Sequence, residues 1–137
     1  MNSIMSSCKA ISAFIGGVLG WFLGGFDTLI YALIAFVSID YITGVWLAAL
    51  EKKVSSDIGF KGISRKVMIF VLVAFGNVID RLVIDNGSAL RSMLIMFYLS
   101  NEGISIIENA GRMGLPLPQK LKEALQKLDS NSSDKKQ

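Results

Sequence analysis

The sequence contains no histidine and a single cysteine among its 137 residues, and these two shortages exclude several kinds of site. The chain has too few nitrogen and sulfur ligands for a zinc centre, and Cys8 has no partner within the chain for a disulfide. No candidate nucleophile has a partner base. We therefore expect a chain that is not an enzyme, with no metal, no cofactor, no nucleic-acid partner and a free thiol at Cys8.

Charged residues are also scarce. They make up 18% of the chain, against about 25% in a typical soluble domain, while 52% of the residues are hydrophobic and the mean hydropathy is +0.51. Four apolar runs cover residues 10–25, 28–50, 67–84 and 88–110. A bilayer core of about 30 Å needs about 20 helical residues. A soluble helical bundle of this length would lack the polar surface to cover four such runs. We predict an all-α integral membrane protein with about four transmembrane helices in residues 1–110.

The first run is shorter than the others and rich in glycine. Residues 10–25 therefore fit a thin span, a re-entrant segment or an interfacial helix, and the sequence leaves these three open.

Basic residues are unevenly distributed between the connecting segments. All but two of the fourteen lysines and arginines lie before the first run, in residues 51–66, or after residue 110. The loop contributes Lys52, Lys53, Lys61, Arg65 and Lys66. The two remaining turns contain Asp27 and Asp85 without lysine or arginine. By the positive-inside rule, both termini are predicted to be cytoplasmic in a multi-pass protein of the cytoplasmic membrane.

Small residues recur at helical spacing in three of the runs. Such strips let helix backbones approach closely in lipid. They serve either an oligomer interface or packing within one subunit, and the sequence does not separate the two. The predicted helix-packing residues are Gly16, Gly20, Gly24, Gly44, Ala48 and Gly76.

Polar residues inside the runs need a specific environment. A charged side chain near the centre of a span costs about 2.5–3.5 kcal/mol to insert, so it faces protein or water rather than lipid. In the fourth run the polar residues form one stripe along the helix. That stripe either lines water between subunits or is buried in hydrogen-bonded helix contacts. The predicted pore-lining or intramembrane polar residues are Asp40, Asn77, Tyr98, Asn101, Glu102, Ser105 and Asn109.

Two of these residues are carboxylates at similar expected depth. At about 1.5 Å per residue, Asp40 and Glu102 lie roughly 18 Å and 21 Å below the outer edge of their spans. If they meet in a dry site, one of them should be protonated, whereas both can ionise if they face a lumen.

Four charged residues flank the turn between the third and fourth runs. Asp80, Arg81, Asp85 and Arg91 balance one another in charge, and we predict an ion cluster at the outer interface. The alternative is that each side chain reaches water independently.

The chain changes character after residue 110. Gly114, Pro116 and Pro118 break the helix, and leucines then alternate with lysines and glutamate. We predict a cytoplasmic basic tail over residues 111–137 with a short amphipathic helix at 118–128 that lies on anionic lipid.

Several stretches resemble those of the toxin-secretion/phage-lysis holin family of small bacterial and phage membrane proteins. These are IDYITG (39–44), SSDIGFKGISRK (55–66), GNVID (76–80) and FYLSNEGISIIENAGRMGLPLP (97–118). Their order and spacing agree with the family, whereas the first run and the tail match only in character. The resemblance implies a homo-oligomeric holin that accumulates in the cytoplasmic membrane, opens lesions, dissipates the membrane potential and releases endolysin or a large toxin. An antiholin partner also belongs to that expectation.

Two other classes remain open from the residues alone. An ion channel or small transporter would make natural use of Asp40 and Glu102, although no filter-like loop or internal repeat is visible. An antiholin-type regulator would share the membrane anchoring without opening lesions.

Overall fold

The computed structural model of the protein describes residues 1–85, 87–121, 123, 124 and 127. These residues form four long α-helices and no strand. The helices are α1 (Asn2–Leu23), α2 (Thr28–Leu50), α3 (Ser56–Ile79) and α4 (Ala89–Arg112), and α3 continues into a π-helical turn, η1 (Asp80–Ile84).

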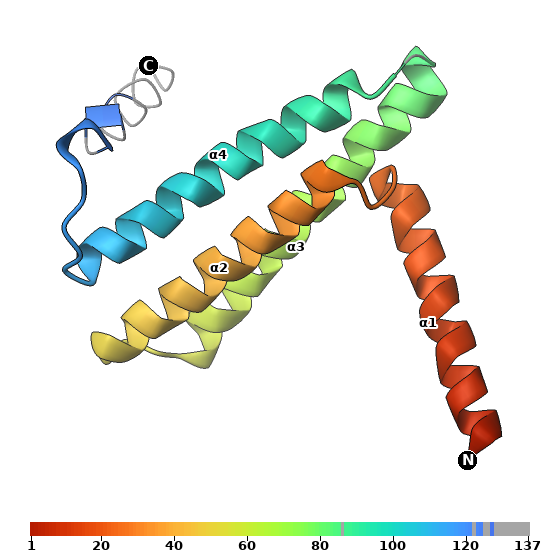
Figure 1. The fold of residues 1–137 in the computed structure, drawn as a ribbon, viewed down its shortest axis with the longest axis horizontal. Coiled ribbons are helices and arrows are strands. Elements are labelled where there is room, and N and C mark those ends of the chain that lie inside the picture. Colours follow the sequence, from red (N-terminus) through yellow and green to blue (C-terminus); the bar gives the residue numbers. More distant parts are fainter. Residues whose placement is uncertain (86, 122, 125–126, 128–137) are drawn as a thin grey trace.

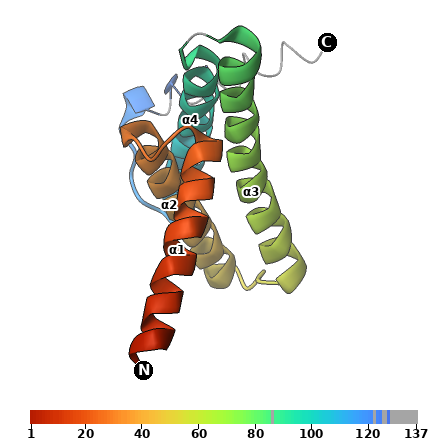
Figure 2. The same ribbon diagram turned by 90° about the vertical axis from the view of Figure 1, so that its right-hand side faces the viewer.

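Three of the helices run side by side, and the first diverges from them. Figure 1 shows α2, α3 and α4 as a bundle in which consecutive helices are antiparallel, while α1 touches the bundle near its own C-terminal end and points away from it. Figure 2 shows the molecule turned so that the side on which α1 lies faces the viewer. The α1–α2 and α3–α4 turns therefore share one end of the bundle. The α2–α3 loop and the end of α4 share the other.

Side-chain caps explain where α2 and α3 begin. Asp27 Oδ1 accepts a hydrogen bond from Ile30 N at 3.0 Å, and Ser55 Oγ accepts one from Ile58 N at 3.2 Å. These oxygens satisfy amides that have no partner inside the helix. The end of α1 is set by Gly24, whose φ of 86° only glycine adopts easily, and Gly25 N closes the turn on Gly20 O at 2.6 Å.

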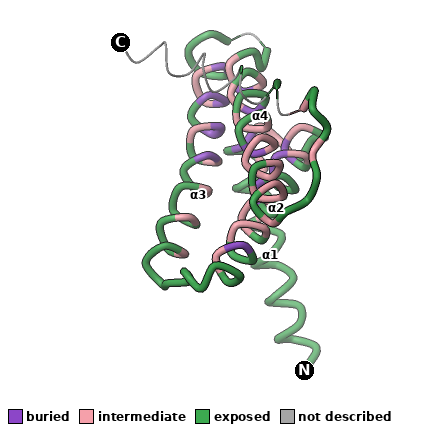
Figure 3. Tube along the Cα trace, turned by 90° about the vertical axis from the view of Figure 1, so that its left-hand side faces the viewer, coloured by how far each residue is buried: buried purple, intermediate pink, exposed green. Residues whose placement is uncertain are grey.

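The buried core is narrow and lies where α2, α3 and α4 meet, as Figure 3 shows. Ile30 and Leu33 of α2 pack with Val73 of α3 and Ile95 of α4, all with no exposed surface. Outside this seam, large apolar side chains cover the surface, such as Phe60, which is 72% exposed. So much exposed apolar surface fits a protein surrounded by lipid.

Three helices are long and apolar enough to cross a membrane, by length and composition. They are α1, α2 and α3 with η1. The expected fourth span corresponds to α4, which has 24 residues but a more polar sequence. The prediction of an all-helical membrane protein is therefore supported, and the four-span arrangement stays a prediction.

The helix bounds differ from the apolar runs at two places. The bounds of α2 equal the predicted 28–50, but α1 begins at Asn2, upstream of the predicted start at residue 10. α3 begins at Ser56, so Lys61, Arg65 and Lys66 lie on a helix and not in the loop. A serine cap with Asp57 in the first turn favours a helix start there, because both compensate the exposed amides.

The tail is described only in part. Residues 119–121, 123, 124 and 127 have helical backbone, and Leu121 borders an apolar groove beside Phe36 of α2 and Gly103 of α4. The other residues of the predicted helix 118–128, including its leucines at 125 and 128, lie outside the described residues except for Pro118.

Candidate functional site: a polar cluster inside the helical bundle

Lys66 of α3 joins two carboxylates that belong to different helices. Its Nζ donates to Asp40 Oδ2 of α2 and, at 2.5 Å, to Glu102 Oε2 of α4. The three side chains are 19%, 12% and 8% exposed for Lys66, Asp40 and Glu102. We call these three residues the carboxylate–lysine cluster. It ties all three helices of the bundle together at one level.

Asn109 of α4 extends the hydrogen-bond network from Asp40 to Thr43, one turn further along α2. Its Nδ2 donates to Asp40 Oδ1 at 3.1 Å and to Thr43 Oγ1 at 3.0 Å, and it lies 3.4 Å from Asp40 O. Thr43 in turn donates to Ile39 O at 2.8 Å. Every buried side-chain nitrogen or oxygen of the described residues has a hydrogen-bond partner.

Two open clefts flank the cluster. The first, of about 580 Å³, lies between α3 and α4 and is lined by Asp40, Lys66, Tyr98, Asn101, Glu102 and Ser105, with Ser64, Arg65 and apolar residues of α3. We call it the α3–α4 cleft. Five of the seven intramembrane polar residues predicted from the sequence line it. Asn77 is elsewhere, and Asn109 lies in the second cleft.

The second cleft, of about 360 Å³, reaches from the α2–α3 loop to the cluster, and we call it the loop cleft. Its walls include Val54 and Ser55 at the loop and Asp40 and Lys66 at the inner end. Small residues make the room. Gly44, Ala48, Gly59 and Gly62 all border it, and so do Arg65, Ser105, Glu108 and Asn109.

A second polar arrangement holds the α1–α2 turn. Arg91 of α4 is 3% exposed and donates Nε to Leu23 O at 2.5 Å and Nη2 to Gly25 O at 3.1 Å. Its two terminal nitrogens bind both carboxylate oxygens of Asp27, at 2.8 Å and 3.1 Å. The hydrogen bond and charge of Arg91 hold the pKa of Asp27 below its ordinary value of 3.8, although partial burial opposes this. We call this arrangement the turn clasp.

Asn77 completes the turn clasp from α3. Its Nδ2 donates to Trp21 O at 3.2 Å and Phe22 O at 3.0 Å, two carbonyls of the last turn of α1. Asn77 is 4% exposed. Within this chain it therefore caps α1 and does not border either cleft.

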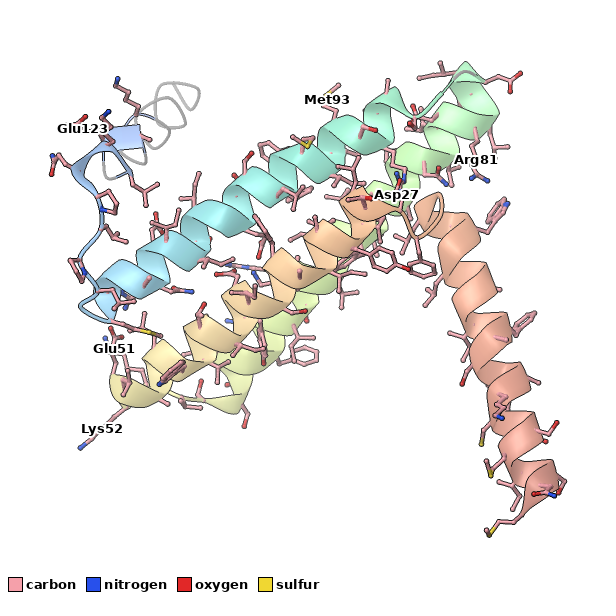
Figure 4. The ribbon with its side chains drawn as sticks, viewed as in Figure 1. Asp27, Glu51, Lys52, Arg81, Met93 and Glu123 are labelled. Carbon is pink, nitrogen blue, oxygen red and sulfur yellow. The ribbon has the colours of Figure 1, made fainter. Side chains whose placement is uncertain are left out.

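The predicted outer ion cluster has a different set of contacts. Asp80 is 1% exposed and accepts the amides of Leu90 and Arg91 at 3.1 Å and 2.9 Å, so it caps the start of α4. Arg91 pairs with Asp27, not with Asp80 or Asp85. Arg81 and Asp85 are exposed and form no ion pair within the described part of the chain. Figure 4 shows Arg81 at the same end of the molecule as Asp27.

The small residues fall into three groups. Gly76 lies against α4, where an added Cβ would be 2.6 Å from Leu94 Cδ1, and Gly24 is enclosed by Asn77 and Arg91. Gly20 touches the ring of Phe26 of the turn. A Cβ at Gly16 would meet nothing within 4 Å. Gly44 and Ala48 border the loop cleft and not a tight helix contact. Of the predicted helix-packing residues, Gly76 is the one that lies closely against another helix of the bundle.

The basic residues at the opposite end are exposed. Figure 4 labels Glu51 and Lys52 at the end of α2. Glu51 binds Arg112 of α4 at 2.9 Å and lies 3.9 Å from Lys53. Lys61 and Arg65 are exposed on α3.

Sequence reasoning missed two members of these sites. The positive-inside rule places Lys66 in the cytoplasmic basic loop, yet in the structure its ammonium group contacts both Asp40 and Glu102. The sequence places Asp27 in a turn without lysine or arginine, and its partner Arg91 lies 64 residues further along the chain. In both cases an unpaired charge in or beside an apolar run was the available signal.

The described residues contain no group of histidine, cysteine, aspartate or glutamate side chains that could hold a metal ion. The site is therefore made of ion pairs and hydrogen bonds between helices.

Comparison with known proteins gives a consistent result. An uncharacterised protein of Clostridium perfringens is 37% identical over 136 residues, which are 98% of this chain and 100% of that protein. An uncharacterised protein of Listeria innocua is 39% identical over 122 residues, or 89% of this chain and 86% of that one. A probable holin of Bacillus phage phi105 is 35% identical over 97 residues, or 71% of each chain. No solved structure matches. The profile of the Bacteriophage holin family matches residues 17–130, which include both clefts and the turn clasp, and the chain therefore belongs to that family.

Proposed function

We propose that this protein is a holin that accumulates in the cytoplasmic membrane, associates with further copies and opens lesions through which endolysin or a large toxin leaves the cell. Membership of the holin family makes it a non-enzymatic membrane protein, and its apolar helices make it multi-pass. The lesion, the oligomer and the cytoplasmic placement of both termini are our proposal.

The observation that carries the proposal is the α3–α4 cleft. It is an open cleft that brings polar groups to a molecular surface that is otherwise largely apolar. Tyr98, Asn101 and Ser105 offer hydrogen-bonding groups along it, and the mostly buried side chains of Asp40, Lys66 and Glu102 also line it. Facing lipid, such a surface is unfavourable. Facing water between gathered copies, it is satisfied, and lateral association is thereby favoured.

The exposed apolar faces supply the other half of the mechanism. Phe14, Trp46 and Phe75 are among the large side chains that are more than half exposed. They keep a single copy stable in lipid. The same faces let copies pack by dispersion, because helix association in lipid depends on close packing and polar contacts more than on a hydrophobic driving force. In this proposal α4 is the fourth span, with its polar stripe towards the lesion.

The test is the substitution Glu102→Leu under controlled expression in a bacterium. Membrane potential and release of a cytoplasmic endolysin are followed together, and membrane insertion is measured by fractionation. Because leucine removes a polar carboxyl group from the cleft wall, we expect lysis to be delayed or abolished while insertion is unchanged. The matched control is Glu108→Leu, the same chemical change at an exposed position of the same helix. Normal timing in Glu102→Leu would refute the assignment of the cleft.

The same expression experiment separates two other functions. The buried ion cluster beside an open cleft also fits an ion channel or small transporter, which would give a graded, ion-selective current without release of endolysin. An antiholin-type regulator would have no effect alone and would delay lysis by a co-expressed holin. Abrupt, delayed leakage of protein supports the holin.

A further inference from the structure

We infer that the carboxylate–lysine cluster is a binding site for one exchangeable proton, which the carboxyl groups of Asp40 and Glu102 share. This site goes beyond the proposed function, and it exists in a single subunit whether or not lesions form.

The first argument is the charge of the cluster. Two carboxylates face one ammonium group, so the fully ionised cluster carries one uncompensated negative charge. All three side chains are more than four-fifths buried in a bundle whose outer surface is apolar. An uncompensated charge in such a place is strongly unfavourable, and uptake of a proton removes it.

The other titratable or charged groups around the cluster do not supply the missing charge. Arg65 of α3 borders both clefts, but it is exposed and makes no ion pair with the cluster. Glu108 of α4 is exposed and has the wrong sign. Tyr41 of α2 and Tyr98 of α4 are phenols, which carry no positive charge in any protonation state.

The second argument is the distance between the two carboxyl groups. Both contact the same lysine nitrogen, so the two carboxyl groups are brought together around one atom. Like charges at such close range disfavour joint ionisation, so one of the two carboxyl groups holds a proton. Asp40 accepts from both Lys66 and Asn109, whereas Lys66 is the donor to Glu102. The proton therefore resides mainly on Glu102.

The third argument is access. The loop cleft extends from Val54 and Ser55 to Asp40 and Lys66, and its volume of about 360 Å³ holds several water molecules. Ser105 and Asn109 provide hydrogen-bonding groups along the way. The proton thus exchanges with the aqueous phase at the end of the bundle that carries the α2–α3 loop.

The experiment is infrared difference spectroscopy of the full-length protein in lipid vesicles. At neutral pH we expect one protonated-carboxyl stretching band that shifts when H₂O is replaced by D₂O. Carbon-13 labelling of glutamate, and separately of aspartate, assigns the band to Glu102 or Asp40. Loss of the band on raising the pH, with recovery on lowering it, demonstrates exchange.

Three variants make the result specific. Glu102→Gln and Asp40→Asn each leave one carboxylate opposite Lys66, so each should lose the band while helical content by circular dichroism is retained. Lys66→Met removes the counter-charge and should bind two protons in place of one. Asp57→Asn, the matched control at an exposed position of α3 outside both clefts, should keep the band. A wild-type protein without the band at neutral pH, or a band that persists in both carboxyl variants, would overturn the inference.

Discussion

Removing Arg91 should release α1 from the bundle without unfolding the other helices. Arg91 makes four hydrogen bonds to the α1–α2 turn, two of them to the carboxylate of Asp27. Hydrogen bonds that involve a charged group each contribute about 1.5–3 kcal/mol. Asp27 is 48% exposed, so its ion pair adds no more than about 1 kcal/mol. The two bonds to carbonyls alone therefore give at least about 3 kcal/mol, and we expect Arg91→Met to weaken docking of α1 by that much or more.

A comparison with Asp27→Asn separates the contribution of the ion pair to the docking of α1 from that of the hydrogen bonds to the carbonyls. Asparagine keeps an oxygen for Ile30 N and loses only the charge, so the expected loss is about 0.5–1 kcal/mol. Because Arg91 lowers the pKa of Asp27, the ion pair stabilises the turn at all pH values above 3.8, and its contribution is lost as the pH falls through the lower pKa of the folded protein. Arg81→Met, at an exposed position of the same end, should cost nothing measurable.

The assay uses the single cysteine of the chain. Cys8 is exposed near the start of α1, and a second label is introduced by Met93→Cys on the exposed side of α4. Spin-label distances, measured at high lipid-to-protein ratio, report the position of α1 relative to the bundle. A loss of about 3 kcal/mol lowers the docked-to-undocked ratio by about 150-fold, so the distance distribution should broaden markedly in Arg91→Met. An unchanged distribution in Arg91→Met, or equal broadening in Arg81→Met, would refute this account.

Three further predictions follow from close contacts and exposed charges. Gly24→Ala should destabilise the chain by more than about 1 kcal/mol in reversible unfolding from detergent, since its φ is 86° and the new Cβ would lie 2.5 Å from Asn77 Oδ1. Gly76→Ala should cost about 1–3 kcal/mol in the same assay because the Leu94 side chain must move aside, and a stability equal to wild type would contradict that close approach. Arg112→Met removes an ion pair with Glu51 between exposed side chains, so the free energy of unfolding should change by less than about 1 kcal/mol. Any such change should vanish at high salt.

Much of the helical architecture follows from the sequence, because apolar length and capping residues are local signals. The bounds of α2 are those expected from its apolar run and the cap at Asp27. The third apolar run starts at residue 67, whereas α3 starts at Ser56, because an apolar run excludes the charged Lys61 and Arg65 while the cap at Ser55 already begins the helix. Hydropathy depends on local composition alone, so it does not show whether a charged side chain has a partner on another helix.

The candidate site was only partly accessible to sequence reasoning, for the same reason. Helical spacing placed Tyr98, Glu102 and Ser105 on one face, and the structure brings all three to the α3–α4 cleft. The pairing of Lys66 with two carboxylates depends on how three helices are rotated against one another, and no local pattern encodes that rotation. Whether these residues line a lesion stays a prediction.

The turn clasp has a consequence for the order in which the protein is assembled. Ribosomes make the chain from the N-terminus, so the α1–α2 turn is synthesised before Asn77 and Arg91. The carbonyls of Leu23 and Gly25 must remain hydrated until Arg91 emerges, because it is the donor that later binds them. The hairpin of α3 and α4 contains its own capping residue, because Asp80 accepts the amides of Leu90 and Arg91 within that hairpin. Biogenesis therefore ends with the second hairpin closing the turn of the first.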